Sequence, residues 1–189
     1  MAKIRVFVAI KPSFSFQKKI SNSLSQLKSL PFSIKWVEEE NLHLTLIFLG
    51  NIAEERLDAV FQAVEKGIEG ISPFSIIPEK IIFLPSGKKP KVLGLSFVGE
   101  IEVLEKLQSQ IQKNLLNFGF KFKKARKFYP HLTLGRIKER IRRKELERRI
   151  GNFSFPLGEK IKVDSVYVFQ SKLLPQGPIY SQLGKFSLK

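Results

Sequence analysis

The sequence predicts an α+β protein with antiparallel strands and two similar lobes. Segments with strand-like alternation and segments with helical spacing follow one another along the chain. Several connections between strands are short, which favours antiparallel pairing. One tetrapeptide, His-Leu-Thr-Leu, occurs at residues 43–46 and again 88 positions later at residues 131–134. We therefore expect two lobes related by an approximate two-fold axis, each contributing one copy of the tetrapeptide to a shared cleft.

The first half begins with a strand and a helix. Residues 3–10 alternate between faces, as in a strand, and Pro12 ends that pattern. Apolar residues then recur at helical spacing over 16–29, which predicts a helix. Ser13 or Ser15 would cap its N-terminus.

Two more strands and a helix complete this half. A short strand is expected at 34–37, and the strand with the first tetrapeptide at 42–49, followed by a turn at 50–51. Apolar positions spaced for a helix predict an amphipathic helix over 57–68, closed by Gly70.

The second half repeats this order of elements with fewer helices. Pro130 supports the start of the second motif strand, because proline lacks a ladder donor and tolerates the first position of a strand. No linker rich in Pro, Gly or Ser divides the chain, so we expect one domain over 1–189 made of two intertwined lobes. The expected elements are strands over 74–84 and 92–98, a helix over 104–118, the motif strand from 131, a charged helix over 137–150, a strand over 161–170 and a short strand over 179–183.

The composition excludes several classes of protein. The chain has 189 residues, a formal net charge of +16 and no cysteine, which rules out disulfides, Cys-ligated zinc and thiol nucleophiles. No apolar run approaches the roughly 18 residues that span a bilayer. The apolar run at 6–10 is too short for a signal peptide. We therefore expect a cytoplasmic protein without a membrane partner, and the basic charge favours anionic partners.

The two tetrapeptides contain every histidine and threonine of the chain. Side chains alternate along a strand, so His43 and Thr45 would face a cleft while Leu44 and Leu46 anchor in a core. A free imidazole titrates near pH 6.5, so a facing pair offers a general acid and a general base near neutral pH. Threonine hydroxyls can donate hydrogen bonds to phosphate oxygens. The pattern therefore predicts acid–base chemistry on a phosphate. In the second copy, His131 and Thr133 would likewise face the cleft, while Leu132 and Leu134 anchor in the core.

Arg136 is a further candidate, five residues after His131. A guanidinium matches phosphate oxygens bidentately and would stabilise transition-state charge. A metal is disfavoured, because two histidines without cysteine fall short of the three or four protein ligands of zinc and neither tetrapeptide contains a carboxylate. No Gly-x-Ser-x-Gly elbow, Walker pattern or Rossmann pattern occurs, so we expect no cofactor.

Paired His-x-Thr motifs about half a chain apart resemble the signature of the 2H phosphoesterases. Within that superfamily the chain is similar to the RNA 2′,3′-cyclic phosphodiesterases, also called 2′-5′ RNA ligases. The likeness covers nearly the whole chain and includes the segments at 5–10, 41–50, 129–136 and 166–171.

This resemblance implies a bilobed α+β fold in which two antiparallel sheets line a central cleft with helices outside. It implies metal-free hydrolysis of a terminal 2′,3′-cyclic phosphate to a 2′-phosphate. His43 would be the proton donor to the departing 3′-oxygen and His131 the proton acceptor that activates water. Thr45 and Thr133 would hold phosphate oxygens, and Phe48 would either stack near the nucleobase or belong to the core. The residues alone do not distinguish the two histidines, because the tetrapeptides are identical.

The expected partner is an RNA end or oligonucleotide with a 2′,3′-cyclic phosphate, bound by a monomer. The basic stretch 121–127 precedes the second motif strand and would attract the phosphate backbone, while Phe120 and Phe122 could stack bases or belong to the core. Two alternatives remain open: ATP-independent 2′-5′ ligation in the same site, and a non-catalytic RNA-binding module. Intact His and Thr pairs argue against the second, since a pure binder does not require two titrating groups.

Overall fold

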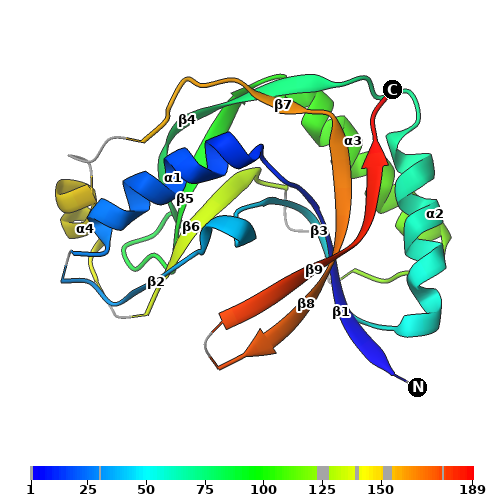
Figure 1. The fold of residues 1–189 in the computed structure, drawn as a ribbon, viewed down its shortest axis with the longest axis horizontal. Helices are drawn as coiled ribbons and strands as arrows, with labels where there is room; N and C mark the ends of the chain where they lie inside the picture. The colour runs from blue at the N-terminus through cyan, green and yellow to red at the C-terminus, as the bar shows by residue number, and fades with distance from the viewer. Residues whose placement is uncertain (1, 30, 123–127, 139–140, 151–154, 176) are drawn as a thin grey trace.

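The computed structural model describes residues 2–29, 31–122, 128–138, 141–150, 155–175 and 177–189. Within these residues the chain forms one curled sheet of nine antiparallel strands, with four α-helices around it (Figure 1). The predicted α+β class is confirmed. No helix in the described part is long and apolar enough to cross a membrane.

Strands and helices alternate along the chain as expected. The helices are α1 (Phe14–Leu27), α2 (Leu57–Ile68), α3 (Ile101–Asn117) and α4 (Arg143–Ile150), with short 3₁₀ turns η1 (Glu39–Asn41) and η2 (Glu54–Arg56). The strands are β1 (Lys3–Ile10), β2 (Ile34–Trp36), β3 (Leu44–Ala53), β4 (Phe74–Leu84), β5 (Val92–Gly99), β6 (His131–Ile137), β7 (Ile161–Val163), β8 (Ser165–Leu174) and β9 (Gly177–Ser187).

The order of strands is symmetric about the two motif strands. It runs β7-β4-β5-β6-β3-β1-β8-β9, with β2 paired to β6 beside this path. The motif strands β3 and β6 meet in the middle through a single pair, Leu44 opposite Leu132. The two expected sheets are therefore the halves of one sheet, and the approximate two-fold axis passes near this pair.

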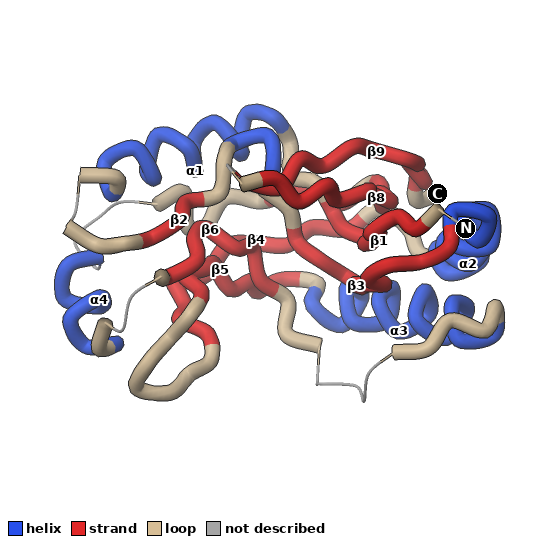
Figure 2. Tube along the Cα trace, turned by 90° about the horizontal axis from the view of Figure 1, so that it is seen from below, coloured by secondary structure: helices blue, strands red, loops and turns tan. Residues whose placement is uncertain are grey.

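Each half of the sheet is covered by a helix that follows a strand of the other half. Helix α1 follows β1 but lies over the half that contains β5 and β6, whereas α3 follows β5 and contacts β3 (Figures 1 and 2). Helices α2 and α3 pack against each other on the opposite side of the sheet from α1 (Figure 2). Because each half of the sheet is covered by a helix from the other half, the arrangement supports the proposal of one domain with intertwined lobes.

The leucines of both tetrapeptides lie in the main hydrophobic core. Leu44, Leu46, Leu132 and Leu134 are 1%, 4%, 0% and 0% exposed. The predicted alternation is confirmed: these residues anchor the strands, and the histidines and threonines lie on the other face. Helix α1 also begins as expected, because the Ser13 hydroxyl accepts a hydrogen bond from the Phe16 amide at 3.3 Å.

The expected turn at 50–51 is wrong. Strand β3 continues to Ala53, and Gly50 pairs with Val6 of β1 while Phe48 pairs with Phe7. One extra residue of β3 therefore forms a β-bulge, and Gly50 has a φ of +73°. The glycine permits a bulge inside a continuing strand rather than ending it.

Three other boundaries differ from the prediction for reasons that depend on distant partners. The expected helix over 137–150 begins only at Arg143, because Ile137 pairs with Ile34 and belongs to β6. The expected strand over 161–170 is two strands separated by Asp164, since β7 pairs with β4 and β8 with β1 at the other end of the sheet. The last strand is longer than 179–183. None of the residues of β9 is fully buried, so its sequence lacks the alternation of buried and exposed positions that would mark its length.

Candidate active site

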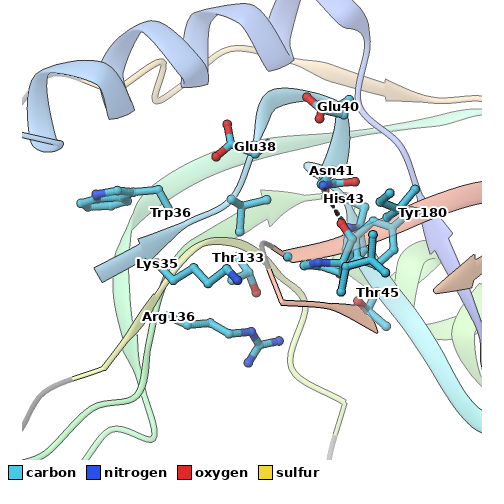
Figure 3. Close-up of a pocket in the computed structure, with 15 residues that line it drawn as sticks. Lys35, Trp36, Glu38, Glu40, Asn41, His43, Thr45, Thr133, Arg136 and Tyr180 are labelled. Atoms are coloured by element: carbon cyan, nitrogen blue, oxygen red, sulfur yellow. Dashed lines mark hydrogen bonds between the residues drawn. The ribbon is translucent and has the colours of Figure 1, made fainter. Parts of the chain in front are cut away.

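A pocket of about 300 Å³ opens where the two motif strands separate. Strands β3 and β2 share one edge of β6: β3 pairs with Leu132 near its start, and β2 pairs with residues 135–137 at its end. The chain between β2 and β3 leaves the sheet through η1 and forms one wall of the pocket. The start of β9 forms the opposite wall (Figure 3).

Four of the predicted site residues line this pocket together. They are His43, Thr45, Thr133 and Arg136. His131 and Phe48 are not among the lining residues. The antiparallel register set by Leu44 and Leu132 nevertheless faces Thr45 with His131 and His43 with Thr133, so both His/Thr pairs surround the same junction.

A β-bulge explains how Arg136 reaches the same face as Thr133, although it lies an odd number of positions, three, farther along the strand. In the β5–β6 ladder Gly94 pairs with Thr133, but Leu93 pairs with Gly135, which leaves Leu134 as the extra residue. One inserted residue reverses the alternation that follows it. Arg136 is therefore exposed on the cleft face instead of being buried.

The first tetrapeptide has the same bulge at the equivalent leucine. Ala9 pairs with Thr45 and Val8 with Ile47, so Leu46 is the extra residue. Phe48 is thus the counterpart of Arg136 in the other half, and its side chain is 49% exposed. The Arg5 guanidinium lies 4.6 Å from the centre of the Phe48 ring. Arg5 thus covers one face of the Phe48 ring, and the contact of Phe48 with a nucleobase stays a prediction.

Both histidines are oriented by the same backbone contact. Nδ1 of His43 lies 2.6 Å from the carbonyl oxygen of Asn41, and Nδ1 of His131 lies 2.8 Å from that of Tyr129. A carbonyl oxygen only accepts, so the hydrogen bond assigns the proton to Nδ1 in each neutral ring. Nε2 is then the atom that can exchange a proton with a substrate.

The two rings differ in their surroundings. Rings of Phe7 and Tyr180 lie 4.8 and 5.2 Å from the His43 ring, the second edge-on at 90°. The ring of Tyr129 lies 6.5 Å from the His131 ring. Identical tetrapeptides therefore present one enclosed imidazole and one open one.

The pKa of His43 is lowered from its ordinary value, chiefly because burial disfavours the charged ring. The hydrogen bond to Asn41 acts in the opposite direction, and the positive charges of His131 and Arg136 lower the pKa further. His131 and Arg136 are therefore within electrostatic reach of the His43 ring. At neutral pH His43 is a neutral base in the free protein.

Sequence reasoning did not assign a role to Lys35 or Tyr180, which both line the pocket. Lys35 belongs to a three-residue strand, and only its pairing with β6 brings it to the site. Tyr180 comes from β9; burial raises the pKa of its phenol, while the charges of Arg136 and Arg5 act to lower it. Tyr180 is thus a neutral hydroxyl donor beside His43. Figure 3 shows it on the same side of the pocket as His43, across from Lys35 and Arg136.

The aromatic residues before the second motif strand belong to the core. Phe120 is 4% exposed, with the Arg56 guanidinium 3.9 Å from the centre of its ring, and Phe122 packs against the same core. Residues 123–127, which carry most of the expected basic stretch, lie outside the described residues. In the described part no group of three or more His, Asp or Glu side chains is arranged to hold a metal.

Comparisons with known proteins agree with this architecture. The family model described as LigT like Phosphoesterase matches residues 10–93 and, separately, residues 97–180, so each half of the chain matches it. The chain is 32% identical to the RNA 2′,3′-cyclic phosphodiesterase of Thermotoga maritima over 95% of this chain and 93% of that protein. It is 31% identical to the protein of that name from Methanothermobacter thermautotrophicus, over 98% and 100% of the two chains. The crystal structure of TT0787 of Thermus thermophilus superposes with a TM-score of 0.77 at 27% identity, covering 98% of both chains.

Proposed function

This chain belongs to the LigT-like phosphoesterase family, and from that premise we propose that it hydrolyses the 2′,3′-cyclic phosphate at the end of an RNA to a 2′-phosphate. The observation that carries the proposal is the pairing at the centre of the sheet, which faces His43 with Thr133 and Thr45 with His131. The names of the curated relatives support the choice of substrate.

The reaction forms one bond to phosphorus and breaks another. Water attacks phosphorus, and its proton passes to Nε2 of His131, the general base. The bond from phosphorus to the 3′-oxygen breaks, and Nε2–H of His43 supplies the proton that this oxygen needs. Thr45 and Thr133 donate hydrogen bonds to the two non-bridging oxygens, and Arg136 stabilises their added charge. The site needs no metal in this scheme, because its own cations and donors face the phosphate.

The donor role of His43 requires substrate binding. Burial keeps His43 neutral in the free protein at neutral pH. A bound phosphate carries negative charge, and an opposite charge within about 4–6 Å favours the protonated ring. Binding of the phosphate therefore favours the protonated form of His43, which is the form that can donate a proton.

Hydrolysis of 2′,3′-cyclic nucleotides by the wild type, His43→Ala and His131→Ala tests the proposal. Each substitution is expected to lower kcat by about 10²–10⁴-fold, because each removes one proton-transfer group. The product should be the 2′-phosphate, and Lys106→Gln on the exposed face of α3 should retain wild-type activity. An inactive wild type would favour a non-catalytic RNA-binding module instead.

A substrate with sulfur in place of the bridging 3′-oxygen separates the two roles. A thiolate departs without a proton, because the pKa of a thiol is near 8.5. His43→Ala should then recover most of its activity on the sulfur substrate, whereas His131→Ala should stay slow on both. The reverse pattern would exchange the roles of the histidines.

A further inference from the structure

Two cations face each other across the β2–β6 ladder at the edge of the pocket. Lys35 is directly opposite Arg136 in the antiparallel register, and both side chains line the pocket. Like charges in this arrangement are unfavourable. Among the residues that the structure describes, neither cation forms a salt bridge or a side-chain hydrogen bond. The pair is therefore an uncompensated concentration of positive charge.

The acidic residues of the pocket wall do not neutralise this pair. Glu38 lies 3.9 Å from the Lys28 ammonium, at the C-terminal end of α1. In Figure 3 the carboxylates of Glu38 and Glu40 point toward α1, while Lys35 and Arg136 extend into the pocket. The two cations remain available to an anion that enters the cleft.

The two cations differ in how close they lie to the reacting phosphate. The reacting phosphate contacts Thr45 and Thr133 at the junction of the motif strands in the proposed mechanism. Arg136 is three residues farther along β6, and Lys35 is its cross-strand partner. Three strand residues span about 10 Å. Arg136 can reach back toward the junction, whereas Lys35 extends toward the start of β9, where its Nζ is 3.6 Å from the Cβ that would be built on Gly177.

We propose that Lys35, together with Arg136, binds a second phosphate: the one on the 5′-oxygen of the nucleotide that carries the cyclic phosphate. An RNA chain bears one negative charge per nucleotide, so this group is present whenever the cyclic phosphate ends a strand. The substrate class is therefore an RNA end whose terminal nucleotide also carries a phosphate on its 5′-oxygen, either free or linked to the preceding nucleotide. A nucleoside that carries only the 2′,3′-cyclic phosphate lacks this group. This inference rests on the proposed function, because it takes the position of the reacting phosphate from it.

Binding of two stable ligands tests the inference without depending on turnover. One is a nucleoside 2′-phosphate, and the other is the same nucleoside with phosphates at both the 2′ and 5′ positions. Calorimetry should show that the wild type binds the bisphosphate about fivefold more tightly, which is the scale of one partly exposed charge contact. Lys35→Gln should abolish this preference and leave the Kd of the 2′-phosphate within twofold. Lys35→Arg should restore the preference, and the control Lys106→Gln should keep it.

Two results would overturn the inference. One is equal affinity of the wild type for the two ligands, including failure to bind either. The other is a Lys35→Gln variant that weakens both ligands by the same factor, since Lys35 would then contact the reacting phosphate. Failure of the proposed function is a different result: it is the absence of cyclic phosphate hydrolysis by a protein that binds both ligands.

Discussion

Gly94 is the position at which one added methyl group should disturb the second tetrapeptide. It pairs with Thr133 in the β5–β6 ladder, beside the bulge at Leu134. A Cβ at residue 94 would lie 2.8 Å from the carbonyl oxygen of Leu132 and 3.6 Å from Cδ2 of His131. Ordinary contacts begin at 3.4 Å, so in Gly94→Ala the strands must separate locally by several tenths of an ångström. The atom in conflict is backbone and cannot rotate away.

The expected cost follows from two opposing effects. Overpacking of this kind destabilises by about 1–3 kcal/mol. Replacing glycine by alanine also restricts the unfolded chain, which returns about 0.4–1 kcal/mol. We expect Gly94→Ala to lower the free energy of unfolding by about 1–2 kcal/mol. Because a 1 Å misplacement of catalytic groups can cost about 10²-fold, a shift of about half that size should lower kcat about tenfold.

Urea unfolding and hydrolysis of a 2′,3′-cyclic nucleotide measure the two effects. Gly87→Ala is the matched control, because nothing lies within 4 Å of its added Cβ, and its unfolding free energy should change by less than about 1 kcal/mol. Ala9 occupies the equivalent position beside Thr45, so the first half already accommodates this methyl group. Wild-type stability and wild-type kcat in Gly94→Ala would refute the reasoning.

Three further predictions concern acidity, metals and the helix pair. Burial lowers the pKa of His43 below the value of 6.5 that it has when unfolded, so the unfolded chain binds a proton more readily. The free energy of unfolding should therefore fall as the pH drops below 6.5, and urea titrations of His43→Asn should lack this part of the decline. Hydrolysis measured with EDTA should match hydrolysis without it; a loss that added metal restores would contradict the proposed mechanism. Arg56 donates from Nη2 to the carbonyl oxygen of Phe118 at 2.8 Å and covers the Phe120 ring, so Arg56→Ala should lose about 1–3 kcal/mol of stability with kcat unchanged.

Features with a local cause were predictable from the sequence. Strand β1 has the expected bounds, since alternation along a strand requires no knowledge of its partner. The same alternation predicted that Leu44 and Leu132 are buried while His43 and His131 lie on the opposite face. Pro130 likewise marked the start of β6, because the missing amide donor acts locally.

Features that depend on pairing between distant segments were not predictable. The bulges at Leu46 and Leu134 exist only relative to β1 and β5, so nothing within the tetrapeptides indicates them. Lys35 enters the pocket through its register with β6. The unequal environments of the two histidines come from Phe7, at the start of the chain, and from β9, at its end. Identical local sequences cannot carry that difference.

The two-fold relation between β3 and β6 has a consequence for the stereochemistry of the reaction. A phosphodiester phosphorus has a local two-fold axis of its own, which exchanges its two non-bridging oxygens and, in the five-coordinate transition state, its two apical positions. In the proposed mechanism the paired strands offer one hydroxyl to each of those oxygens and one imidazole to each apical position. Entering and leaving groups would thus meet the same types of residue, and the difference between the two positions comes from the surroundings of the histidines, one enclosed and one open. In this scheme the group that occupies the apical position beside His131 decides which product forms: water gives hydrolysis, and the 5′-hydroxyl of a second strand gives ligation.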